Sequence, residues 1–134
     1  MQNRSMPVGA LIPVLGYDDV AEAADWLCSA FGFTERWRAG SHRVQVAIGD
    51  CAVALAENGP RGSNVMVRVD DVEAHYSRAR ERGAHVSGSP TDYPYGERQY
   101  SAIDPGGHHW TFSQSIADVA PEDWGAESGP ALEA

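Results

Sequence analysis

Two side chains in this sequence, Glu57 and His109, have the types and positions that acid–base chemistry or metal binding requires. Glu57 ends an alternating stretch that begins at Cys51, and a carboxylate on the apolar side of a strand is costly unless another group pairs with it. His109 alternates with Thr111 in a second strand, and an imidazole can serve as acid, base or metal ligand. Each residue also has a structural interpretation: an ion pair for Glu57 and a solvent-exposed histidine for His109.

Other side chains with the same predicted orientation would line a binding cleft beside this pair. Alternation along each strand places every second residue on one face, which defines an inward set. Trp37, Met66 and Tyr100 would supply stacking and polarizable surface, and Arg43 or Arg98 would pair with Glu57. The predicted ligand-binding residues are Trp37, Arg43, Gln45, Glu57, Asn64, Met66, Arg98, Tyr100, His109 and Thr111.

A hairpin between Tyr95 and Ser113 carries several of these residues. Its turn, 104–107, reads Asp-Pro-Gly-Gly, which predicts a type II turn with a positive φ at Gly106. Beyond the turn, one face carries hydroxyl and imidazole groups and the other carries Trp110 and Phe112. The hairpin is therefore expected to have one face on a core and one face open.

The elements that must position these residues occur twice in the chain. Asp18-Asp19-Val20 returns as Asp70-Asp71-Val72, each time between a predicted strand and a predicted amphipathic helix. Each half reads strand, helix and three strands, which predicts an α+β fold of paired βαβββ modules, residues 8–58 and 64–114. We expect one domain over residues 1–124, a curved, barrel-like mixed sheet with an open cleft between the halves, and a flexible tail over 125–134.

Composition narrows the classes of partner. With 134 residues, 43% of them hydrophobic, the chain can bury one core. A net charge of −9 argues against nucleic acid and anionic membranes as partners, because both attract basic clusters. No stretch approaches the roughly 20 apolar residues of a membrane span. Cys28 and Cys51 form no metal or disulfide motif, so we expect buried thiols in a cytoplasmic protein.

Several of these motifs together resemble the vicinal oxygen chelate superfamily, which includes glyoxalase I, extradiol dioxygenases and bleomycin-resistance proteins. The resemblance spans roughly residues 8–124. It is carried by Asp19-Val20 leading to Ala30-Phe31-Gly32-Phe33, by Gly49-Asp50 before Leu55-Ala56-Glu57, by Val69-Asp70-Asp71-Val72 with Gly83-Ala84, and by Tyr95-Gly96-Glu97-Arg98 through Asp104-Pro105-Gly106-Gly107-His108. It implies the paired-module fold and a homodimer with clefts at or beside the subunit boundary.

The resemblance also implies where a divalent metal would bind in the metal-dependent members. Those positions correspond to Ile12, Glu57, Asn64 and Thr111, so only Glu57 is an ionisable ligand. One carboxylate with an amide and a hydroxyl is a poor site for zinc, nickel or iron. We therefore expect no metal and no cofactor, with Glu57 and His109 as the ligands if a divalent metal does bind.

Two functions remain open from the sequence. The first is metal-free binding of a small aromatic or cationic, drug-like molecule in the cleft, which the acidic charge favours. The alternative is a metal-dependent lyase, isomerase or dioxygenase with shifted ligands, such as Glu57, His109 and His42. Because one fold supports all of these activities, sequence alone does not decide whether the protein is an enzyme.

Overall fold

The structure, a computed structural model, describes residues 1–133 and contains two modules with the same order of elements. The first comprises β1 (Val14–Gly16), α1 (Val20–Phe31), β2 (Thr34–Ala39), β3 (Arg43–Ile48) and β4 (Cys51–Ala56). The second comprises β5 (Asn64–Arg68), α2 (Val72–Glu81), β6 (His85–Val86), β7 (Thr91–Tyr93), β8 (Glu97–Ile103) and β9 (His109–Ser115). The 3-10 helix η1 (Pro121–Trp124) and the helix α3 (Pro130–Glu133) follow. The predicted α+β fold is confirmed, with β7 as an additional strand.

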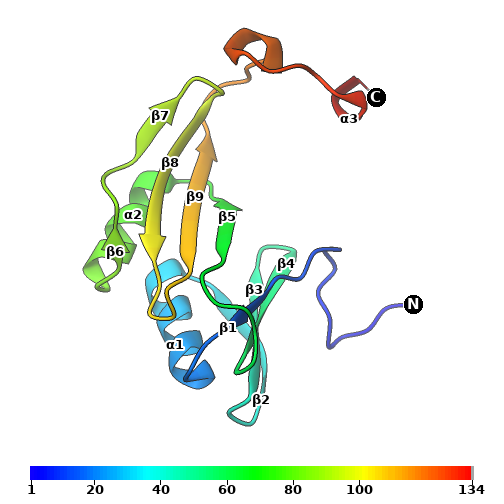
Figure 1. Ribbon diagram of the computed structural model, residues 1–134, viewed down its shortest axis with the longest axis vertical. Helices are drawn as coiled ribbons and strands as arrows, with labels where there is room; N and C mark the ends of the chain where they lie inside the picture. Colours follow the sequence, from blue (N-terminus) through cyan, green and yellow to red (C-terminus); the bar gives the residue numbers. More distant parts are fainter. Residues whose placement is uncertain (134) are drawn as a thin grey trace.

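Each module forms its own mixed sheet. Sheet A has the strand order β1-β4-β3-β2, and sheet B has the order β5-β9-β8-β6, with β7 also paired to β8. The first strand of each module pairs in parallel with the last, and the remaining pairs are antiparallel. Helices α1 and α2 contact each other on one side of the molecule (Figure 1). Sheets A and B do not close into a barrel within the chain.

Local sequence explains where the two helices begin and end. The Asp19 carboxylate accepts a hydrogen bond from the Glu22 backbone N–H, and Asp71 caps α2 in the same way through Ala74. Gly32 ends α1 in the left-handed region at φ 76°, where glycine carries no steric penalty. The repeated Asp-Asp-Val motif therefore marks both helix starts, as the sequence predicts.

The core lies between the helices and one face of each sheet. In sheet A this face carries Val44, Val46, Val53 and Leu55, all nearly inaccessible to solvent. In sheet B it carries Trp110 and Phe112. From the alternation in β4 alone, a helix could pack closely over the small alanines at 52, 54 and 56, and Val53 and Leu55 would face the cleft together with Glu57; both expectations are wrong. The larger side chains of Val53 and Leu55 bury more apolar area against α1 than the alanines would.

Asp104, at the end of β8, holds the two modules together. Its Oδ1 accepts hydrogen bonds from the backbone N–H groups of Gly106 (2.9 Å) and His108 (3.0 Å). Its Oδ2 accepts from the indole of Trp110 (2.9 Å) and from the hydroxyl of Tyr17, which follows β1 in the first module. Four donors converge on two oxygens, an arrangement that suits an ionised carboxylate.

The turn after Asp104 differs from the predicted type II turn. The positive φ falls at Gly107 (83°), and Gly106 is not among the residues with positive φ. The Asp104 carboxylate binds the Gly106 N–H and so favours a different turn. Gly106 is required for a steric reason, because a Cβ there would lie 2.5 Å from the Tyr17 ring.

His108 adds a second, fully buried contact between the modules. Its Nδ1 accepts a hydrogen bond from the Ser63 N–H (3.0 Å), so its Nε2 carries the proton and donates to the Gly16 carbonyl (2.7 Å). This contact links β1 to the turn that precedes β9.

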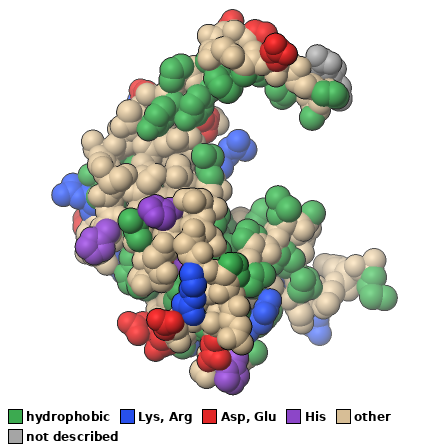
Figure 2. All heavy atoms as spheres, in the orientation of Figure 1, with side chains coloured by type: hydrophobic (Ala, Val, Ile, Leu, Met, Phe, Trp, Pro, Cys, Tyr) green, Lys and Arg blue, Asp and Glu red, His purple; other side chains and the backbone are tan. Residues whose placement is uncertain are grey.

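The segments outside the modules were less predictable. The C-terminal segment stands away from the body of the molecule (Figures 1 and 2). Within it, α3 lies in the stretch 125–133 that was expected to be flexible, while Ala134 lies outside the described residues.

Cys28 is half-buried and Cys51 is exposed, so the expectation of a buried thiol is wrong for Cys51. Among residues 1–133, no helix is long and apolar enough to cross a membrane.

Candidate functional site

The open face of sheet B, opposite the helix-covered face, gathers several of the predicted site residues. Asn64 lies beside His109 and Met66 lies beside Thr111 in the parallel β5–β9 pair. Thr111 in turn faces Ser101 of β8. The predicted neighbours Asn64, Met66, His109 and Thr111 therefore share one surface, and Asn64, Met66 and His109 are exposed on it.

This face carries a network of hydroxyl and amide groups. The hydroxyls of Ser101 and Thr111 hydrogen-bond each other at 2.9 Å. One step along the strands, the Gln99 amide donates to the Ser113 hydroxyl (3.0 Å), which donates to the Glu97 carboxylate (2.7 Å). These contacts fix the orientations of the side chains and so preorganise a polar, largely uncharged surface.

A cavity of about 280 Å³ lies beside this network. It is lined by Met66, Gln99, Ser101, Thr111, the loop residues 87–89, Thr91 and Tyr93, and also by Tyr100, which is only 3% exposed. Met66 is 65% exposed, and a polarizable thioether at that position would pack readily against an aromatic ligand. The volume of this cavity is just below the range of about 300 to 1,000 Å³ typical of small-molecule sites, so a drug-sized ligand would also contact the open surface around the cavity.

Aromatic rings extend this surface toward the C-terminal segment. Tyr93 and Tyr95 stack with ring centroids 5.5 Å apart and planes at 11°, and Trp124 meets Tyr95 edge-on at 5.4 Å. Tyr93 and Trp124 are both more than 40% exposed, and hydrophobic side chains gather at the base of the C-terminal segment in Figure 2. Trp124 thus packs against Tyr95 of the second module.

Arg98 and Tyr100 do not belong to this surface. Tyr100 pairs with Phe112 across β8 and β9, stacks on it and is 3% exposed, so it faces the core. Arg98 lies two residues before Tyr100 and so on the same side of β8, where it forms an ion pair with Asp92 (Nε to Oδ1, 2.6 Å). The predicted orientation of β8 is wrong by one residue, which exchanges the two faces of a strand. Gln99 and Ser101 take the positions assigned to Arg98 and Tyr100.

Behind Tyr100, the half-buried His75 joins the two modules. The ring of His75 donates from Nε2 to the Phe31 carbonyl (3.0 Å), and its Nδ1 accepts from the Tyr100 hydroxyl. Burial lowers the pKa of His75, and burial also raises the pKa of Tyr100. Both groups are therefore neutral at physiological pH and act as structural contacts between the modules.

Sheet A holds the remaining predicted residues. Glu57, just beyond β4, contacts His42 (Oε2 to Nδ1, 3.0 Å) rather than Arg43 or Arg98, and both side chains are largely exposed. Gln45 and Trp37 lie on the open face, where Gln45 accepts a hydrogen bond from Arg36 at 2.6 Å. No hydrogen bond between Glu57 and His109 is found among the described residues, so the structure does not bring this pair together.

The residues at the metal positions do not fit a divalent metal centre. Asn64 and Thr111 offer an amide and a hydroxyl, and Glu57 is engaged by His42 on the other sheet. Within residues 1–133, no three His, Cys, Asp or Glu side chains come together as a metal site. No reaction step through a metal is therefore derived for this chain.

The hydroxyls of sheet B are also poorly placed for nucleophilic catalysis. Thr111 and Ser101 bind each other, and neither hydrogen-bonds a base. Ser113 does contact a carboxylate, but hydrogen bonds from Ser115 and Ser113 lower the pKa of Glu97 and make it a weaker base. Ser113 itself is 3% exposed. Among residues 1–133, no hydroxyl of this face is therefore placed as an activated nucleophile.

Comparison with known proteins agrees with this fold. The model of the Glyoxalase/Bleomycin resistance protein/Dioxygenase superfamily matches residues 11–112. This range covers most of both modules, and the chain therefore belongs to that superfamily. The resemblance to vicinal oxygen chelate proteins seen in the sequence is thus confirmed.

Three individual proteins are similar to this chain over most of its length. Mb0911c, an uncharacterized protein of Mycobacterium bovis, is 30% identical over 130 residues, covering 82% of this chain and 86% of that protein. TnmS3, an antibiotic binding protein from Streptomyces sp. CB03234, is 28% identical with a TM-score of 0.69, covering 82% of this chain and 98% of TnmS3. TioX from Micromonospora sp. ML1 is 28% identical with a TM-score of 0.71, covering 84% and 100%.

Proposed function

We propose that this protein binds a small aromatic or cationic, drug-like molecule at the open face of sheet B, without a metal and without transforming it. The observation that carries the proposal is the combination on one face of a fixed hydroxyl and amide network with exposed Met66 and the Tyr93–Tyr95 stack. Stacking surface and a few fixed polar groups are what recognition of a planar ligand requires. The similarity to an antibiotic binding protein supports the same conclusion.

Charge supports a preference for cations. The chain carries a net charge of −9, and the long-range field of such a protein attracts positive ligands. Glu97 borders the binding network and keeps its charge because hydrogen bonds lower its pKa. A planar cation would therefore be drawn to the surface and then stack on Tyr93.

We further propose a cytoplasmic homodimer. Sheets A and B are not closed into a barrel within one chain, so a second copy would complete an enclosed cleft. The two free thiols are consistent with a reducing compartment. Light scattering during size-exclusion chromatography tests this proposal. We expect a particle with twice the mass of one chain, and a particle with the mass of a single chain would contradict the dimer.

Titration calorimetry with three probes tests the binding proposal. The probes are bleomycin, the planar cation proflavine and the planar anion 8-anilinonaphthalene-1-sulfonate. We expect the cationic planar probe to bind more tightly than the anionic one. We expect Tyr93→Ala to weaken binding about two- to tenfold, since one aromatic contact contributes about 0.5 to 1.5 kcal/mol. His85→Ala, an exposed change on β6, is the matched control and should have no effect.

Two results would contradict the proposal. The first is binding of none of the probes, or binding that Tyr93→Ala leaves unchanged. The second is near-stoichiometric metal in protein purified without chelator, which would favour a metal-dependent enzyme instead.

A further inference from the structure

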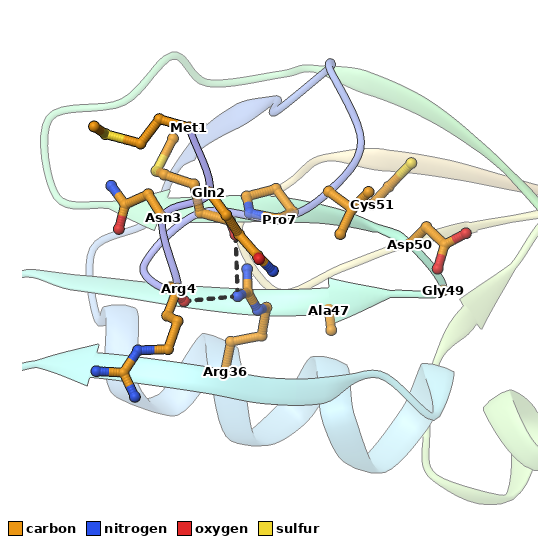
Figure 3. Close-up of a pocket in the computed structure, with 12 residues that line it drawn as sticks. Met1, Gln2, Asn3, Arg4, Pro7, Arg36, Ala47, Gly49, Asp50 and Cys51 are labelled. Atoms are coloured by element: carbon orange, nitrogen blue, oxygen red, sulfur yellow. Dashed lines mark hydrogen bonds between the residues drawn. The ribbon is translucent and has the colours of Figure 1, made fainter.

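Residues 1–8 lie across the open face of sheet A, on the side opposite helix α1 (Figure 3). A cavity of about 850 Å³ lies between this segment and the sheet. Its walls include Met1, Arg4 and Met6 from the segment and Arg36 and Ala47 from the sheet. The segment therefore covers the face on which the sequence places Gln45 and Trp37 for ligand binding.

The contacts that hold the segment run from side chains of the sheet to the backbone of the segment. The Arg36 guanidinium donates to the carbonyl oxygens of Arg4 (3.0 Å) and Met6 (3.2 Å), as Figure 3 shows. The Trp37 indole N–H donates to the carbonyl between them, that of Ser5 (2.9 Å). Three successive peptide carbonyls are thus bound by two adjacent side chains.

A bulge in β2 makes this arrangement possible. The register between β2 and β3 shifts between Glu35 and Trp37, so that Arg36 is the extra residue and both Arg36 and Trp37 lie opposite Gln45. In a regular strand, adjacent side chains would point to opposite faces. Gln45 further orients the guanidinium by accepting its Nη1–H at 2.6 Å. The bulge therefore places both donors on this face, and Gln45 holds the guanidinium there independently of the segment.

The segment gains little from burial of its own side chains. Val8 is 88% exposed and Met6 is 45% exposed. Its attachment depends on hydrogen bonds to backbone carbonyl groups, which any peptide-like molecule also offers. Another molecule with amide carbonyls at similar spacing would meet the same donors.

We propose that residues 1–8 occupy, within their own chain, a binding face for extended molecules with successive amide carbonyl groups, and that such a ligand displaces the segment. The inference rests on the proposed function in taking the open sheet faces as the ligand-binding surface. It adds a ligand class, peptide-like molecules, and a segment that competes with the ligand.

Limited trypsin digestion of the full chain tests the attachment, because the carbonyl of the Arg4–Ser5 bond is the one that Arg36 binds. Mass spectrometry would follow the loss of residues 1–4. We expect Arg36→Met to speed this cleavage about tenfold, the effect of losing charged hydrogen bonds worth about 1.4 kcal/mol together. Arg38→Met is the matched control, because Arg38 binds Asp25 and Glu35 instead and should leave the rate unchanged.

Trp37→Phe provides a second variant that keeps the ring and removes the N–H donor. We expect it to speed cleavage at Arg4 by a smaller factor, about threefold, because one neutral hydrogen bond is lost. Circular dichroism would establish that each variant is folded. Equal cleavage rates in the wild type and in folded Arg36→Met and Trp37→Phe variants would overturn the proposal.

A free peptide tests the ligand class. The peptide MQNQSMPVG has the backbone of residues 1–9 and, with Arg4→Gln, no trypsin site. We expect it to accelerate cleavage of the wild-type chain in a saturable way and to have no such effect on Arg36→Met. An unchanged wild-type rate at millimolar peptide would overturn the inference.

The outcomes separate this inference from the proposed function. If proflavine binds in a Tyr93-dependent way while the peptide and Arg36→Met change nothing, only the present inference fails. If the peptide displaces the segment while no probe binds at Tyr93, only the proposed function fails.

Discussion

Replacing Asp104 by asparagine tests the contact that joins the two modules. An asparagine has one oxygen where the carboxylate has two, so its amide nitrogen must face two of the four donors. If the nitrogen replaces Oδ1, it meets the backbone N–H groups of Gly106 and His108, and a backbone N–H can only donate a hydrogen bond. If it replaces Oδ2, the Tyr17 hydroxyl can rotate and accept, but the Trp110 N–H cannot.

The second orientation is the less costly one, and it sets the expected magnitude. Trp110 is fully buried, so its N–H would lose its partner where no water can replace it. An unsatisfied buried donor costs about 1 to 3 kcal/mol, and replacing charged by neutral hydrogen bonds at the other three contacts adds to this. We expect Asp104→Asn to lower the free energy of unfolding by about 3 kcal/mol, a large part of the 5 to 15 kcal/mol typical of a domain.

Urea unfolding followed by circular dichroism measures this change. Tyr17→Phe removes only one of the four donors and should cost less than Asp104→Asn. Asp118→Asn is the matched control on an exposed carboxylate, and we expect it to stay within about 0.5 kcal/mol of the wild type. A loss below about 0.5 kcal/mol for Asp104→Asn would refute the role assigned to this carboxylate.

Two further predictions concern stability. Gly106→Ala places a Cβ 2.5 Å from the Tyr17 ring and should lower the free energy of unfolding by about 1 to 3 kcal/mol, whereas Gly129→Ala, where the added atom meets nothing, should not. Burial lowers the pKa of His75, so the unfolded chain takes up this proton first as the pH falls below about 6.5. The free energy of unfolding should therefore fall between pH 7.5 and 5, and His75→Gln should reduce that fall; equal pH dependence in both proteins would contradict the assignment.

Local sequence patterns predict most of the fold. The Asp-Asp-Val repeat marks both helix starts because an aspartate side chain caps a helix through its neighbours in sequence. The alternation in β3 and β9 identifies their core faces, because apolar side chains on one face have only one layer to pack against. These signals are short-range, which is why a single sequence reveals them.

The orientation of β8 shows where pattern fails. Arg98, Tyr100 and Ala102 alternate with Gln99 and Ser101, so neither face is plainly apolar in sequence. The choice depends on Phe112 and His75, which offer Tyr100 a stacking partner and a hydrogen bond in the core. A tyrosine selected by such distant contacts cannot be assigned from its own strand.

The sequence predicts only part of the candidate site. The parallel pairing of β5 and β9 puts the open-face residues of the two strands side by side. This pairing brings together Asn64, Met66, His109 and Thr111. Tyr93 was missed because a short strand in a loop gives no periodic signal. The bulge at Arg36 was missed because an extra residue in a strand is set by pairing with its neighbour rather than by its own sequence.

Calorimetric titration with bleomycin, followed by mass spectrometry of the recovered compound, tests the central claim most directly. Under the proposed function, the fixed polar groups and stacking surface of sheet B hold a ligand without transforming it. The proposal therefore predicts saturable binding and bleomycin recovered unchanged in mass. Bleomycin recovered with an altered mass, or no heat of binding with bleomycin or with either planar probe, would contradict the claim.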